Sequence, residues 1–224
     1  MRAMVRKLGR DEKPRRQPPD LPPRVDDLNV VTADTIIAGL PVENSRAQNL
    51  DLSGLKLPAL TARTALFNRV SLASCEISSL HLRDVRLVKC DLSNTLLRGF
   101  QARRVEFIDC RLIGMRAIEC RWQDVLVEGC DARYAQLNSG QVRTCEFKGS
   151  QMAEADLRAT DLEGTIFTDV VLQRADLTGA KLRSTDLRGA DIEGIMVRAE
   201  DVRGAIVSVA QAMDLARLLG IVIK

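Results

Sequence analysis

Apolar residues recur along this chain with a period of five, and the period is kept without interruption over most of its length. Counting in steps of five from Leu52 to Val207, every position carries an apolar side chain, with Leu82, Trp122 and Leu162 among them. Five matches neither the 3.6-residue period of a helix nor the two-residue period of a strand. A fixed short period predicts a repeat architecture.

A second column of small or apolar residues lies two positions before each central one. All six cysteines fall in this column, and the position that follows it is often Asp. Ten of the fourteen glycines lie two residues after a central position, where a corner with positive φ would favour glycine. Two inward positions in every five, with a bend each time, wind the chain into a coil around an apolar axis.

The pentads ADLTG, ADIEG, TDLRG and CDLSN resemble those of the pentapeptide-repeat family, whose consensus is A-(D/N)-L-x-x. The resemblance covers residues 50–209 without a slip in register. It implies an all-β fold, a right-handed quadrilateral β-helix with four pentads per coil. Residues 50–209 would then form a solenoid of about eight coils, about 38 Å long at the usual strand spacing of about 4.8 Å.

The segments before the repeat differ from it in composition. Residues 1–28 contain five of the seven prolines among mixed charges, which predicts a disordered Pro/Arg-rich N-terminal tail. Residues 29–49 keep the period of five loosely. We expect them to form an irregular N-terminal cap or first coil.

Residues 210–224 are predicted to form a helix that caps the far end of the solenoid. Ser208 and Gln211 have the spacing of a capping box. The resemblance implies that such a C-terminal element often mediates dimerisation, and a simple monomeric cap is the alternative. The candidate cap or dimer residues are Met213, Ala216 and Leu219.

Candidate catalytic and metal-binding residues are few. The single histidine, His81, lies at an outward position of its pentad. Cys90, Cys110 and Cys130 recur at twenty-residue spacing, which stacks them in a line that cannot surround a metal tetrahedrally. All six cysteines are explained as small buried apolar residues. With no phosphate-binding loop or nucleophile elbow in the sequence, we expect no cofactor, no metal and no enzymatic activity.

The sequence also bears on location. No stretch approaches the roughly 20 consecutive apolar residues of a membrane-spanning helix. The first thirty residues lack the apolar centre of a signal peptide. We therefore expect a cytoplasmic protein with no membrane partner.

Two sets of outward residues are candidate partner surfaces. The first is a column of arginines at twenty-residue spacing, which offers a strip for phosphate groups or an acidic protein, or else forms a solvated face whose side-chain stems cover their neighbours. The second is a group of outward apolar residues, which would mark a partner or dimer contact if contiguous. The arginine column comprises Arg63, Arg83, Arg103, Arg143, Arg183 and Arg203, and the apolar group comprises Leu66, Val88, Ile108 and Leu126.

Three functions are compatible with this pattern. The resemblance implies one of them, because the quinolone-resistance members of the family mimic duplex DNA and occupy DNA gyrase. Charge disfavours it, since B-DNA carries one negative charge per about 1.7 Å, whereas residues 50–209 contain 22 acidic and 22 basic residues that cancel. We expect a protein-interaction or scaffold module with an unidentified protein partner. Anion or nucleic-acid binding through the arginine column is the third possibility.

Overall fold

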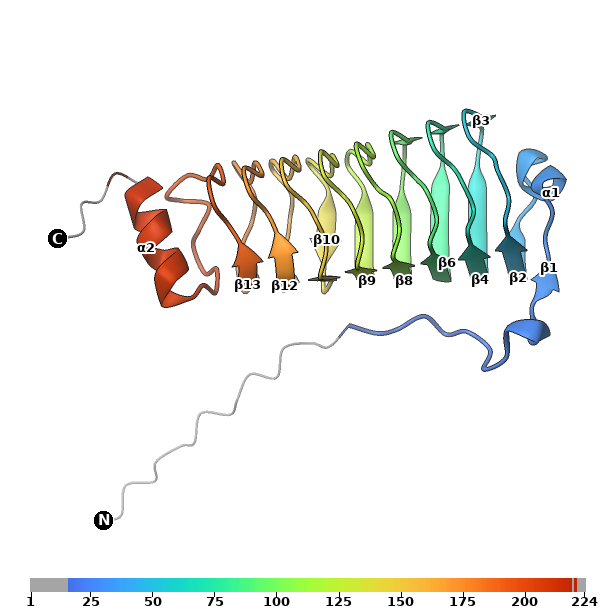
Figure 1. Ribbon diagram of the computed structural model, residues 1–224, viewed down its shortest axis with the longest axis horizontal. Helices are drawn as coiled ribbons and strands as arrows, with labels where there is room; N and C mark the ends of the chain where they lie inside the picture. The colour runs from blue at the N-terminus through green and yellow to red at the C-terminus, as the bar shows by residue number, and fades with distance from the viewer. Residues whose placement is uncertain (1–15, 219, 221–224) are drawn as a thin grey trace, which may run out of the picture.

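The computed structural model describes residues 16–218 and residue 220. The chain is a right-handed quadrilateral β-helix, a parallel β-solenoid of about eight coils that ends in a short C-terminal helix (Figure 1). This confirms the predicted fold class. The coils stack along one axis, so the long dimension of the molecule is the direction in which the repeat advances.

Two parallel sheets form walls of the solenoid. The larger sheet contains β1 (Asn29–Val30), β2 (Val42–Gln48), β4 (Leu60–Asn68), β6 (Leu80–Val88), β8 (Gln101–Ile108), β9 (Arg121–Glu128), β10 (Gln141–Arg143), β11 (Glu146–Lys148), β12 (Ile166–Val171) and β13 (Asp186–Asp191). The smaller sheet contains β3 (Lys56–Leu57), β5 (Glu76–Ile77) and β7 (Leu96–Leu97). The helical segments are η1 (Val25–Asp27), α1 (Ala33–Ile37) and α2 (Val209–Leu218).

The strands pair in a register that repeats every twenty residues, with one local irregularity between β12 and β13, where Thr168 lies opposite Gly189. Ala62 lies opposite Leu82, and Leu82 lies opposite Ala102, so one coil takes four pentads. Because parallel strands without a shift place equivalent residues above one another, each position of the pentad becomes a line of side chains along the solenoid. The twenty-residue spacing in the sequence is therefore a spacing of one coil, about 4.8 Å, in space.

The core is the column of central residues inside the coils. Every central residue from Leu52 to Ile192 is buried. The rings of Phe147 and Phe167 stack in this column with centroids 5.0 Å apart. The last three central residues are only half-buried, because no further coil follows them; they are Val197, Val202 and Val207.

The second column combines small side chains with weak hydrogen-bond donors. All six cysteines are buried and unpaired. Cys75 Sγ donates to the carbonyl oxygen of Leu52 at 2.9 Å, and Thr95 Oγ1 donates to that of Leu72 at 2.8 Å. Both carbonyls belong to the preceding coil. The column therefore accepts Cys, Ser, Thr and Ala alike, since these side chains are small and the polar ones are satisfied.

Burial raises the pKa of the Cys120 thiol to about 12, and this makes stability depend on pH. In the unfolded chain a thiol ionises near its ordinary pKa of about 8.5. The folded state holds the proton more tightly, so this contribution to stability is complete below about pH 8.5 and is lost as the pH rises towards about 12. We expect Cys120→Ala to flatten the fall in unfolding free energy above about pH 9 in urea denaturation. An unchanged slope would contradict this assignment.

The first coil begins within residues 29–49, the segment expected to form an irregular cap or first coil. β2 pairs with β4 in the regular register, with Val42 opposite Ala62, so the coil in this segment is regular from β2 onward. The cap itself is α1 with the residues around it, where Ile36 is buried against the first coil. The period is weak over these residues because the polar side chains of β2 face outward and its neighbours turn into the cap.

The far end is covered by α2, which begins at the predicted capping box. Ser208 N–H donates to Gln211 Oε1 at 2.8 Å, and Gln211 N–H donates to Ser208 Oγ at 3.2 Å. The Gln211 amide then donates to the carbonyl oxygens of Leu187 and Ala190 at 2.6 and 2.7 Å. Gln211 thus closes the helix start and satisfies carbonyls of the last full coil at the same time.

The face of α2 that covers the core is not the predicted one. Leu215 is buried beside Gln211, whereas Met213 is 41% exposed and Ala216 is half-buried. The candidate Met213 does not cover the core because the open coil end presents carbonyl groups, which favour the Gln211 amide over a purely apolar side chain. Leu219 lies outside the described residues. A dimer contact through the exposed Met213 stays a prediction.

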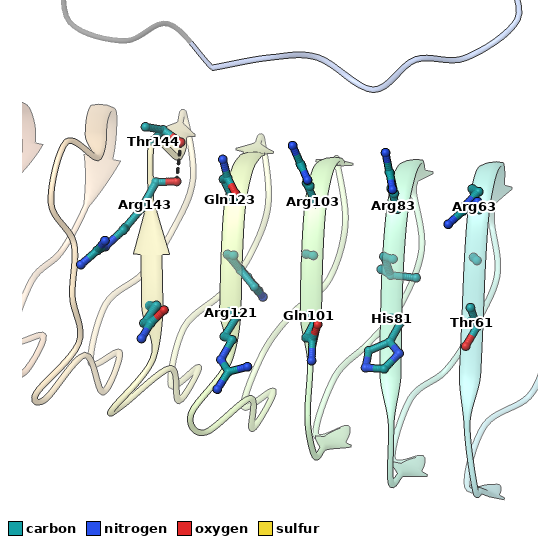
Figure 2. Close-up of a pocket in the computed structure, with 15 residues that line it drawn as sticks. Thr61, Arg63, His81, Arg83, Gln101, Arg103, Arg121, Gln123, Arg143 and Thr144 are labelled. Atoms are coloured by element: carbon teal, nitrogen blue, oxygen red, sulfur yellow. Dashed lines mark hydrogen bonds between the residues drawn. The ribbon is translucent and has the colours of Figure 1, made fainter.

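Part of the segment predicted to be a disordered tail is ordered against the solenoid. Residues 16–24, which we call the N-terminal strap, run back along one side of the coils towards β1 (Figures 1 and 2). Arg16 contacts Glu106, and the Asp20 N–H donates to Asp84. The prediction failed here because composition does not reveal that carboxylates of the coils lie in reach of the strap. Residues 1–15 lie outside the described residues.

Candidate binding groove

Four of the six predicted arginines, Arg63, Arg83, Arg103 and Arg143, lie on the larger sheet, where the residues beside each central one point outward. The register stacks Arg63 opposite Arg83, and Arg83 opposite Arg103. Figure 2 shows a second outward row beside this one, two positions earlier in each strand. We call the two rows the arginine row (Arg63, Arg83, Arg103, Gln123 and Arg143) and the mixed row (Thr61, His81, Gln101, Arg121 and Gln141).

A groove of about 750 Å³ runs between the two rows, which form its walls. Its direction follows the solenoid axis, because each wall gains one residue per coil. The groove falls within the range of about 300–1,000 Å³ that is common for ligand sites. The floor comprises the central residues Ala62, Leu82, Ala102 and Trp122.

The groove carries positive charge that the fold leaves largely uncompensated. Among the described residues, five arginines and no acidic residue line it. Within residues 16–218 and 220, Arg63, Arg103 and Arg121 make no ion pair, while Arg83 Nε lies 3.6 Å from Asp84 Oδ2. Neighbouring guanidinium groups about 5 Å apart repel by less than about 1 kcal/mol in water-like surroundings. The free protein tolerates this repulsion, and an anion bound between the arginines would remove it.

The other members of the predicted column are differently placed. Arg143 closes the groove and donates to the Asp161 carboxylate through Nε at 3.0 Å, with a second, shorter bond from its terminal nitrogen. Arg183 and Arg203 line a separate hollow towards the C-terminal end, and Arg183 Nε lies 3.9 Å from Glu163 Oε1. The six predicted arginines therefore form two groups, of which only the first four share the groove.

The mixed row had no role in the prediction. His81 and Arg121 bring a titratable and a cationic side chain to the wall opposite the arginine row. The sequence did contain a signal for this wall, since both residues precede a central position and lie forty residues, or two coils, apart. The structure is needed to show that His81 and Arg121 share a groove with Arg83 and Arg103, because the two outward rows lie on either side of one inward column.

The predicted apolar group does not form one continuous patch. Val88 and Ile108 are in-register neighbours and half-buried. Leu66 and Leu126 belong to the next row, where charged residues of two intervening coils separate them. Leu126 is only 8% exposed. Spacing along the sequence could not show this separation, because it depends on which residues fill the coils between.

In the part of the chain that the structure describes, no group of three or more His, Cys, Asp or Glu side chains is placed to hold a metal ion. No described helix has the length and apolar character needed to cross a membrane.

Comparisons with known proteins add two family matches. A model described as a pentapeptide repeat region matches residues 80–157, and a model of eight pentapeptide repeats matches residues 150–189. No curated protein matches the sequence.

Three solved structures are similar to the chain at low sequence identity. A trypsin-treated form of QnrB1, a plasmid-mediated fluoroquinolone resistance protein, is 22% identical, with 88% of this chain and 96% of that chain covered and a TM-score of 0.39. HetL from the cyanobacterium Nostoc sp. strain PCC 7120, involved in heterocyst differentiation regulation, is 18% identical, with coverages of 77% and 92% and a TM-score of 0.32. Rfr23 from Cyanothece 51142 is 13% identical, with coverages of 73% and 91% and a TM-score of 0.29.

Proposed function

We propose that this chain, which belongs to the pentapeptide-repeat family, is a non-enzymatic protein-interaction module that binds an acidic segment of a partner protein in the arginine groove. The observation that carries the proposal is the set of groove arginines without an ion pair in the described chain, Arg63, Arg103 and Arg121. A guanidinium can take a carboxylate by two parallel N–H donors. Arginines one coil apart can also share one carboxylate between them.

The shape of the charged region favours an acidic peptide over a nucleic acid. Proteins that bind single strands combine a basic groove with aromatic side chains on which bases stack. Among the described residues, Trp122 is the one Phe, Tyr or Trp that lines this groove, and it is 2% exposed and forms part of the floor. The positive strip also ends after five coils, because the next coil carries Asp161 and Glu163 at the positions of Gln141 and Arg143. Such a short, non-stacking strip suits a segment with a few carboxylates.

The same charges weigh against the other functions. A DNA mimic would present an acidic surface, whereas the groove is cationic and acidic and basic residues of the repeat cancel overall. An enzyme would require a nucleophile or an acid–base pair within hydrogen-bond reach in a concave site. Among the groove residues of the described chain, His81 has no hydrogen bond to Thr61 or to another side chain that would complete such a pair.

Charge reversal in the groove tests the proposal. The probe is a fluorescein-labelled octaglutamate peptide, and binding is followed by fluorescence anisotropy at low salt. We expect Arg83→Glu with Arg103→Glu to weaken binding by at least about tenfold, because two guanidinium donors become like charges. The matched control is Arg98→Glu with Arg116→Glu, which makes the same change in net charge at exposed arginines by the smaller sheet; its affinity should change less than about twofold.

Two outcomes would contradict the proposal. An equal loss in both double variants would show that net charge, and not the groove, governs binding. Tighter binding of a labelled single-stranded oligonucleotide than of octaglutamate, lost on the same groove substitutions, would assign the groove to nucleic acid instead.

A further inference from the structure

The N-terminal strap lies in an acidic channel beside the arginine groove, and the two adjoin where Arg83 Nε lies 3.6 Å from Asp84 Oδ2. Arg16 carries the side-chain contact: its terminal nitrogen lies 3.1 Å from Glu106 Oε1, and its Nε lies 3.8 Å from Glu146 Oε2. Glu106 and Glu146 pair with Leu126 from the coils on either side. The guanidinium therefore lies over Leu126, which is only 8% exposed.

The strap backbone makes the other contacts. Gln17 N–H donates to Asp124 Oδ1 at 3.4 Å, and Asp20 N–H donates to Asp84 Oδ1 at 3.0 Å. Asp84 and Asp124 are corner residues with positive φ, and forty residues of sequence place them two coils apart. Both carboxylates are buried, at 5% and 6% exposure. We call the surface formed by the line of Asp84 and Asp124 and the neighbouring line of Glu106, Leu126 and Glu146 the acidic channel.

The spacing of the two aspartates matches the rise of a polyproline II segment. Two coils span about 9.6 Å at the usual strand spacing. Between the donors at Gln17 and Asp20 the chain advances three residues, or about 9.3 Å at the polyproline II rise of about 3.1 Å per residue. Pro18 and Pro19 fill the positions between them, where they fix φ and remove N–H groups that would have no acceptor. The strap therefore fits the coil repeat with one donor for every second coil.

Asp84 is held in its charged form. Burial by itself would raise the pKa of Asp84, but hydrogen bonds from Arg104 and from the Asp20 N–H outweigh it and lower that pKa. Arg104 donates to both Asp84 oxygens at 2.5 Å, and Thr144 Oγ1 donates to Asp124 at 3.0 Å. The coils therefore orient the two carboxylates. Each carboxylate can still accept a hydrogen bond, and this free acceptor position faces the backbone of an extended segment.

We propose that the acidic channel is a docking site for an extended segment of a partner protein that carries an arginine followed by a Pro-Pro pair, and that Arg16–Asp20 occupies it as a displaceable internal ligand. Only one strap side chain, that of Arg16, makes an ion pair or hydrogen bond with the channel in the described chain. The other contacts use backbone N–H groups, which any segment of the same conformation supplies. Recognition thus requires an arginine, a free N–H after it, two prolines and a second N–H.

Because the strap belongs to the same chain as the acidic channel, it competes with any free segment that could bind there. A tethered segment acts at an effective concentration in the millimolar range, so a free segment binds the native protein weakly. Any change that loosens the strap then opens the channel. A basic partner segment is also favoured by charge, because the channel contributes four carboxylates and the neighbouring Arg86 and Arg104 offset only part of them.

The test uses the full-length protein and a fluorescein-labelled peptide with the sequence of residues 14–24, PRRQPPDLPPR. Arg16→Glu removes the strap's ion pairs, and we expect this variant to bind the peptide at least about tenfold more tightly than the wild type. The matched control Arg24→Glu makes the same charge change at an exposed strap arginine and should bind within about twofold of the wild type. Adding Glu106→Gln to Arg16→Glu should abolish the gain.

Hydrogen exchange gives a second measurement that needs no variant. Excess peptide added to the wild type should speed exchange at the Gln17 and Asp20 amides, because it displaces them from the aspartates. Equal peptide affinity of the wild type and Arg16→Glu, or unchanged exchange at both amides, would overturn the proposal. So would a wild-type dimer in light scattering that dissociates on adding peptide, since the occupant would then be the strap of a second copy.

Discussion

Leu162→Asp is expected to unfold the solenoid. Leu162 is fully buried in the central column, with equivalent residues of the adjacent coils, Val142 and Leu182, below and above it. A carboxylate there would be buried among apolar side chains without a partner, which costs more than about 4 kcal/mol. Total stability of a domain is about 5–15 kcal/mol. Because each coil is supported only by its neighbours, the loss should spread through the solenoid, as urea denaturation followed by circular dichroism would show.

Gln101→Asp is the matched control, since it introduces the same carboxylate at an outward position of the same repeat. Gln101 is exposed in the mixed row, and a surface substitution of this kind changes stability by less than about 0.5 kcal/mol. Similar losses in the two variants would contradict the assignment of inward and outward positions. A cooperative transition for Leu162→Asp close to that of the wild type would do the same.

The coiled core could be predicted in detail because spacing alone sets side-chain direction in this fold. Once five residues make one wall, every fifth residue points inward, and Leu52 and Ile192 are buried for the same reason although they are many coils apart. Stacking of the arginines follows equally, since residues twenty apart must be neighbours. The local pattern and the global fold agree at each coil, which is the condition for a sequence to specify one structure.

The groove walls, the strap and the cap face depend on contacts that no period describes. Arg16 and Glu106 are ninety residues apart in sequence, and nothing in the composition of a proline-rich segment identifies its acceptor. The paired prolines and the corner aspartates Asp84 and Asp124 were the available signals. They become informative only when the rise of a polyproline II segment is compared with the coil spacing. At the C-terminal end, Gln211 covers the core because its amide donates to the backbone carbonyl oxygens of Leu187 and Ala190. A pattern of side chains does not reveal where such backbone acceptors lie.

Trp122→Ala is expected to cost about 3–5 kcal/mol, the range for removing a large buried aromatic side chain. Trp122 is 2% exposed. Its ring packs edge-on against Phe100, with the ring centroids 5.4 Å apart, and stacks on Phe107, with the centroids 5.8 Å apart. Alanine itself is compatible with this column, since Ala102 occupies the equivalent position one coil earlier. The loss would therefore come from the space that the indole fills beside its aromatic neighbours, and urea denaturation would measure it.

Trp122→Phe separates this cavity from the polar atom of the indole. In the described chain the indole N–H is buried without a hydrogen-bond partner, and removing such a group recovers part of its desolvation cost of about 1–3 kcal/mol. The phenylalanine variant keeps the ring contacts with Phe100 and Phe107 and should therefore lose far less stability than the alanine variant. Equal losses would show that the buried N–H is satisfied in solution and that ring size contributes little. We expect the alanine variant to have a much lower free energy of unfolding than the phenylalanine variant. That result would show that the aromatic cluster of Phe100, Phe107 and Trp122 is the main support of the surface that carries the unpaired arginines.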